Sequence, residues 1–190
     1  MSEAGKDTGG AAGRALEVNG RHSRTVRLSV SPQADFREVV RTIESITIPP
    51  VRVSPEHVRF AVLELINNSV RAHRETGETR SVSIDLTVAD SRLVVAIRDF
   101  GGGFDPGRLP YPLDADPKEL DVHSPAFEEY QQRHGYKRFG MGIYVAKKTF
   151  DDFRLVFLDR NDRPVPWAPG ACAGTLITLA VSGQEAPHGG

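Results

Sequence analysis

Cysteine is nearly absent from the sequence, which contains only Cys172. One thiol cannot close an internal disulfide, and no paired cysteines are spaced as ligands of a structural zinc ion. We therefore expect a reducing compartment and a fold that depends on a hydrophobic core rather than on cross-links.

Long apolar runs and an excess of one charge are missing too. Residues 1–20 lack the apolar centre of a signal peptide, and no later run approaches the roughly 18–20 residues that span a membrane. Lysine plus arginine number 24 against 25 acidic residues, so no field of one sign attracts nucleic acid or an anionic membrane. We expect a cytoplasmic protein with no direct nucleic-acid partner and no membrane partner.

Two common nucleotide-binding signatures do not occur. The P-loop pattern G-x-x-x-x-G-K-[ST] is absent from the chain. The Gly-x-Gly at 101–103 is followed by a proline-containing stretch rather than a helix, and no parallel βαβ pattern surrounds it. These features argue against a dinucleotide-binding fold.

The composition that is present is that of one ordinary globular domain. Hydrophobic residues make up 39% and charged residues 26% of the 190 residues, which suits one domain with a sizeable core. Both ends lack apolar periodicity, so residues 1–22 and 183–190 are predicted to be disordered tails. Residues 23–182 then form the domain.

Apolar spacing predicts the order of the elements. Alternation predicts strands at 24–30, 82–88, 93–97, 153–158 and 175–181, and three-and-four spacing predicts helices at 34–45, 55 to about 77, 126–133 and 143–150. Strands 82–88 and 93–97 are expected to form a hairpin. The order predicts the α+β class: a two-layer α/β sandwich, with a mixed, mostly antiparallel sheet and helices on one face.

Residues 104–139 form a long connection with several prolines and no sustained periodicity. Such a segment in a single domain is either functional, often as a lid, or disordered.

Glu64 and Asn68 lie one turn apart on the flank of the apolar stripe of the second helix. The Glu64 carboxylate could polarise a water or hydroxyl, and the Asn68 amide oxygen could enter a Mg²⁺ shell. Asn67 points away from the core edge, so Asn68 is the preferred ligand. The alternative is a polar helix edge with an i,i+4 hydrogen bond.

Two glycine-rich segments could complete a binding site. Asp99 precedes Gly101, Gly102 and Gly103, whose backbone can approach a flat ligand while the carboxylate accepts a hydrogen bond from an amine such as adenine N6. The sequence Gly140-Met141-Gly142 opens a helix whose free N–H groups suit phosphates, with Arg138 just upstream. A solvated turn and an ordinary basic surface are the alternatives.

These motifs together resemble the GHKL (Bergerat-fold) ATPase superfamily, which has an N box, a G1 box, a lid and a G2 box. The resemblance extends over roughly residues 26–181. The sequences Glu-Leu-Ile-Asn-Asn at 64–68, Arg-Asp-Phe-Gly-Gly-Gly-Phe-Asp at 98–105 and Arg-Phe-Gly-Met-Gly-Ile at 138–143 look most like bacterial anti-sigma factor serine/threonine kinases. The segment between Gly103 and Gly140 is long for that family.

The resemblance implies a role for each motif residue, with ATP and Mg²⁺ as cofactors. Glu64 would be the catalytic base and Asn68 the metal ligand, while Asp99 would hold adenine with support from Thr175. The remaining nucleotide-binding residues would be Gly101, Gly103, Arg138, Gly140, Met141 and Gly142.

Three functions agree with such a site. The first is a serine/threonine kinase that phosphorylates or sequesters a regulatory protein, either anti-anti-sigma-like or sigma factor-like. The second is a non-catalytic, nucleotide-gated binding module. The third is a stand-alone histidine kinase-like ATPase domain, although the sequence before Arg24 leaves no room for a dimerisation helix pair with a phosphoacceptor histidine. A homodimer is expected from the resemblance alone.

Overall fold

The computed structural model describes residues 15–121, 124–133 and 141–184. Alternating apolar residues build a six-stranded sheet in the order β3-β5-β6-β9-β7-β8. Its strands are β3 (Thr25–Val30), β5 (Val82–Ala89), β6 (Arg92–Arg98), β7 (Asp152–Leu158), β8 (Pro164–Val165) and β9 (Gly174–Ser182). All strand pairings in the described part of the chain are antiparallel.

The predicted hairpin between β5 and β6 is present, and a two-residue turn connects its strands. Ala89 pairs with Arg92, which leaves the two-residue loop Asp90-Ser91. Both loop residues have positive φ, 48° and 59°, as a primed turn that follows the right-handed twist of the strands requires.

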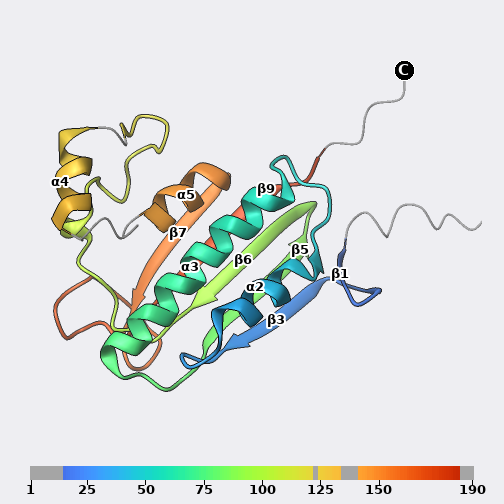
Figure 1. Cartoon of the computed structure of the whole chain (residues 1–190), viewed down its shortest axis with the longest axis horizontal. Helices are drawn as coiled ribbons and strands as arrows, with labels where there is room; N and C mark the ends of the chain where they lie inside the picture. Colours follow the sequence, from blue (N-terminus) through green and yellow to red (C-terminus); the bar gives the residue numbers. More distant parts are fainter. Residues whose placement is uncertain (1–14, 122–123, 134–140, 185–190) are drawn as a thin grey trace, which may run out of the picture.

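Three helices cover one face of this sheet (Figure 1). They are α2 (Phe36–Glu44), α3 (Pro55–Thr76) and α5 (Met141–Thr149). The ends of α3 follow from local chemistry: the Ser54 side chain accepts a hydrogen bond from the His57 N–H, and Gly77 adopts a left-handed φ of 70°. The predicted two-layer α+β sandwich is confirmed.

A second, three-stranded sheet lies at the N-terminal end, in the order β2-β1-β4. It consists of β1 (Leu16–Val18), β2 (Arg21–Ser23) and β4 (Ile46–Thr47). The expectation of a disordered tail over residues 1–22 therefore does not hold from Leu16 onward, because that side chain is 0% exposed within the core. Residues 1–14 and 185–190 lie outside the described residues.

The described part of the long connection packs against α5. It contains the 3₁₀ turn η1 (Pro106–Arg108) and helix α4 (Pro125–Arg133), which confirms the helix predicted at 126–133. Tyr111 stacks on Phe127 with ring centroids 6.0 Å apart, and both rings meet Tyr144 of α5. The Lys147 ammonium of α5 also donates to the carbonyl oxygens of Leu113 and Ala115.

No helix within the described ranges is long and apolar enough to cross a membrane.

Candidate functional site

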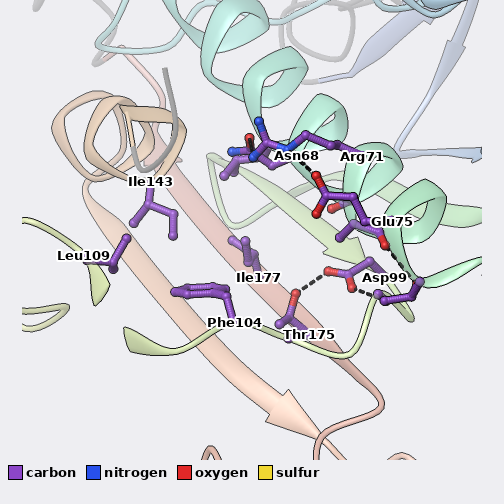
Figure 2. Close-up of a pocket in the computed structure, with 15 residues that line it drawn as sticks. Asn68, Arg71, Glu75, Asp99, Phe104, Leu109, Ile143, Thr175 and Ile177 are labelled. Carbon is purple, nitrogen blue, oxygen red and sulfur yellow. Dashed lines mark hydrogen bonds and ion pairs between the residues drawn. The ribbon is translucent and has the colours of Figure 1, made fainter. Parts of the chain in front are cut away.

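A cavity of about 230 Å³ lies between α3 and the sheet, next to the end of β6 (Figure 2). Helix α3 forms one wall, and residues from β9, from α5 and from the segment after β6 form the others. The lining residues are Leu65, Asn68, Ser69, Arg71, Ala72, Glu75, Thr76, Asp99, Gly101, Gly103, Phe104, Leu109, Ile143, Thr175 and Ile177. The cavity thus combines apolar walls with a few polar groups, as small-molecule sites do.

Asp99 is a buried lining residue of this cavity and is held in one orientation. It directly follows β6 and is only 6% exposed. Its Oδ1 accepts a hydrogen bond from the Gly101 N–H at 2.8 Å, and its Oδ2 accepts one from the Thr175 hydroxyl. Each carboxylate oxygen can accept a second hydrogen bond, so the group can still receive an amine from a ligand.

The loop after Asp99 needs glycine because it passes directly against other backbone. A Cβ added at Gly101 would lie 2.5 Å from the Ala72 Cβ on α3. A Cβ at Gly174, where β9 begins, would lie 2.0 Å from the Asp99 carbonyl oxygen. Both contacts are far closer than carbon and oxygen atoms tolerate, so these glycines allow the strand ends and α3 to enclose the cavity.

Asn68 and Arg71 form the polar edge of the cavity on α3, as Figure 2 shows. The Asn68 Oδ1 accepts a hydrogen bond from Arg71 Nη2 at 3.2 Å, and Arg71 Nε lies 3.8 Å from Glu75 Oε1. An amide oxygen beside a guanidinium suits a ligand that carries both a hard cation and negative charge, because Mg²⁺ takes few protein ligands and phosphate groups pair with arginine.

Glu64 lies one turn before Asn68 and is half-buried, but it is not among the described residues that line the cavity. The first turn of α5 packs at this place. A Cβ added at Gly142 would lie 2.5 Å from Asn68 Nδ2 and 3.4 Å from the Glu64 Cβ. The predicted base and metal ligand are therefore neighbours of the predicted phosphate-binding helix.

Helix α4 lies within electrostatic range of Arg71 on α3. Its residue Tyr130 is buried, and burial raises the pKa of Tyr130 to about 12, while the positive charge of Arg71 acts in the opposite direction. Arg71 thus donates a hydrogen bond to Asn68, and its charge also acts on Tyr130.

Of the ten predicted site residues the structure describes eight, and it brings five of these together. Asn68, Asp99, Gly101, Gly103 and Thr175 line one cavity, although they come from three separate parts of the chain. The remaining described ones, Glu64, Met141 and Gly142, lie on α3 and α5 beyond its lining. Arg138 and Gly140 lie outside the described residues.

Several lining residues were missed from the sequence. On α3, Arg71, Glu75 and Thr76 continue the face of Asn68 at helical spacing, so extending that face by two turns would have found them. Phe104, Ile143 and Ile177 carry no such signal, because apolar residues are common and only the folded chain places these three around the cavity.

The comparison with known families agrees with this geometry. The family described as the histidine kinase-like ATPase domain matches residues 28–162, more than half of the chain. This chain belongs to that family. The expected membership of the GHKL superfamily is thereby confirmed, and it implies an ATP-binding domain. A comparison with curated proteins gives no match.

The cavity fits part of the nucleotide that the histidine kinase-like ATPase domain implies. Its volume of about 230 Å³ is below the roughly 300–1,000 Å³ of pockets that enclose a drug-sized ligand. It would therefore suit the base alone, between the Asp99 carboxylate and apolar walls such as Phe104. The phosphates would lie toward Asn68 and Arg71 at its polar edge.

Proposed function

We propose that this protein is an ATP-dependent serine/threonine kinase of the anti-sigma factor type, which phosphorylates or sequesters a small regulatory protein. The observation that carries the proposal is the position of Asp99 and Asn68 in one cavity, with Glu64 one turn from Asn68. The partner would be anti-anti-sigma-like or sigma factor-like, and the catalytic domain would act as a homodimer.

Asp99 and Thr175 would recognise the adenine base. The Thr175 hydroxyl donates to Asp99 Oδ2. Because each carboxylate oxygen can accept two hydrogen bonds, Asp99 can still accept one from the 6-amino group of adenine. An amine-free purine would leave this buried carboxylate without that partner. The pair would therefore produce a preference for ATP over nucleotides that lack the amino group.

The phosphate end would involve Asn68, Arg71 and the first turn of α5. Asn68 would supply an amide oxygen to a bound Mg²⁺, which would neutralise phosphate charge. The Arg71 guanidinium, which donates to Asn68 in this structure, would be close enough to that edge to pair with phosphate oxygens. Among the residues outside the described ranges, Arg138 and Gly140 would complete this end, as the family resemblance implies.

Glu64 would act as the general base. Its carboxylate accepts the proton of the partner's Ser or Thr hydroxyl, the hydroxyl oxygen forms a bond to the γ-phosphorus, and the bond from that phosphorus to the β–γ bridging oxygen breaks to release ADP. Glu64 is half-buried beside α5, so the partner's hydroxyl would approach at the edge where α3 meets α5.

A second function, a nucleotide-gated binding module without phosphoryl transfer, is favoured by two observations. Glu64 is not among the residues that line the cavity, and the Asn68 oxygen is engaged by Arg71. In that case nucleotide would change the affinity for the partner without any chemistry.

Incubation with γ-labelled ATP and host lysate separates these functions. Acid-stable label on a Ser or Thr of another protein supports the kinase, acid-labile label indicates a histidine acceptor, and nucleotide-dependent capture of a partner without label indicates the binding module.

The Glu64→Gln variant tests the role of the base. We expect ATP affinity within about threefold of the wild type and label transfer reduced by at least about 100-fold, because only proton acceptance is removed. Glu56→Gln, on the exposed first turn of the same helix, is the matched control and should transfer normally. Parallel loss of binding and transfer in Glu64→Gln would instead show a structural role.

A further inference from the structure

His73 is a buried histidine of α3 that has no role in the function proposed above. Its side chain is 0% exposed, and both ring nitrogens are hydrogen-bonded. Nε2 lies 2.7 Å from the Phe100 backbone nitrogen, and Nδ1 lies 3.0 Å from the Arg80 carbonyl oxygen. A backbone N–H only donates and a carbonyl only accepts, so the ring is neutral, with its hydrogen on Nδ1.

The Phe100 side chain is held as firmly as its backbone. The Arg80 guanidinium carbon lies 3.8 Å from the centroid of the Phe100 ring, and that of Arg98 lies 4.6 Å away. His73 approaches the same ring with centroids 6.2 Å apart. These contacts join the end of β6 to the connection between α3 and β5.

The bond between His73 and Phe100 acts directly on the residue that is proposed to recognise adenine. The Phe100 N–H and the Asp99 carbonyl belong to the same peptide group. His73 holds the N–H side of this group, and the backbone of Gly174 lies against the carbonyl side, where even a Cβ would come within 2.0 Å. The peptide after Asp99 is thus held from two directions, and its plane sets the direction of the Asp99 side chain.

We propose that His73 is a positioning residue for base recognition: through the Phe100 amide it holds Asp99 in the orientation that receives the purine 6-amino group. This proposal rests on the proposed nucleotide site and assigns a further residue to it. His73 itself does not line the cavity. It acts on Asp99 indirectly, through the peptide group between Asp99 and Phe100.

Two amide substitutions separate the two hydrogen bonds of the ring. The Gln side chain reaches about as far as Nε2, so His73→Gln can still accept from the Phe100 N–H. The Asn side chain reaches about as far as Nδ1, so His73→Asn can still donate to the Arg80 carbonyl but cannot reach Phe100. Both are neutral and similar in polarity, so each is the control for the other.

The readout is the ratio of affinities for ATP and for purine riboside triphosphate, which lacks the 6-amino group, measured by calorimetry with Mg²⁺. We expect the wild type and His73→Gln to prefer ATP by about tenfold or more, and His73→Asn to lose most of this preference. A general loss of stability would weaken both nucleotides equally and leave the ratio unchanged. A retained preference in His73→Asn, or equal loss in both variants, would overturn the proposal.

A measurement without nucleotide distinguishes failure of this proposal from failure of the proposed function. In the ¹⁵N spectrum of the wild-type imidazole rings, His73 should show a protonated Nδ1 and an unprotonated Nε2. A hydrogen on Nε2 would refute the His73–Phe100 bond, whatever the protein binds. Absence of ATP binding by the wild type, with the expected ring spectrum, would refute the nucleotide site and with it the role of His73 in base recognition.

Discussion

At the polar edge of the cavity, Asn68 accepts a hydrogen bond from Arg71. The proposed role of this single asparagine as a metal ligand can be tested by substitution. Removal of the amide in Asn68→Ala should abolish the part of the ATP affinity that depends on Mg²⁺. We expect chelation of Mg²⁺ to weaken ATP binding of the wild type about tenfold or more, and that of Asn68→Ala by less than about threefold. Calorimetry with and without Mg²⁺ measures both.

The control for this prediction is the adjacent Asn67→Ala, because Asn67 is exposed on the same helix. It should keep the full Mg²⁺ dependence. If Asn68→Ala kept it as well, the metal ligand would have to be another residue.

At the scale of elements, the contact between α3 and α5 depends on the absence of a side chain at Gly142. A methyl group there would lie 2.5 Å from Asn68 Nδ2, so Gly142→Ala must move either the helix or the asparagine. We expect a loss of about 1–3 kcal/mol in the free energy of unfolding and about tenfold weaker ATP binding. Denaturant unfolding and calorimetry measure these two effects.

Gly107→Ala provides the comparison, because Gly107 is exposed on η1 and, among the described residues, its added Cβ would meet just the side chain of Asp105, at 3.2 Å. That variant should keep both stability and affinity. Normal ATP binding by a folded Gly142→Ala would show that the first turn of α5 does not control Asn68.

The connection between α3 and β5 makes the stability of the fold depend on pH through Glu78. The pKa of Glu78 is lowered from 4.5 to about 2, first because the Arg80 side chain donates to its carboxylate at 2.7 Å and then because the Arg80 backbone N–H also donates. Folding therefore stabilises the ionised form of the Glu78 carboxylate relative to the protonated form. Its contribution is complete above pH 4.5 and is lost as the pH falls toward about 2.

Glu78→Gln should accordingly be less stable than the wild type at neutral pH, and its stability should fall less between pH 4.5 and about 2. Urea unfolding at a series of pH values measures the difference. Parallel pH profiles for the two proteins would contradict this role of the carboxylate.

At the scale of the whole molecule, the N-terminal hairpin belongs to the folded domain. Leu16 is fully buried, so Leu16→Ala should lower the free energy of unfolding by about 2–5 kcal/mol, through lost burial and a cavity. Glu17→Ala on the same strand should have a small effect, because Glu17 is not fully buried. Equal melting temperatures for Leu16→Ala and wild type would show that the hairpin is not part of the cooperative unit.

This hairpin also shows where sequence patterns were insufficient. Strands of three residues are too short for alternation to be recognised, although Asn19-Gly20 is a strong turn signal and both residues have positive φ, 51° and 74°. By contrast, α3 could be predicted almost to its last residue, because Ser54, Pro55 and Gly77 mark its ends by local chemistry.

Periodicity, caps and motif spacing are properties of neighbouring residues, so the helices, the main strands and the family could be predicted from them. The contacts that hold the site together could not. The bond from Thr175 to Asp99 joins residues 76 positions apart, and the bond from Phe100 to His73 joins residues 27 apart. Such contacts depend on the pairing of β6 with β9 and on the packing of α3 against the sheet, which no local pattern specifies.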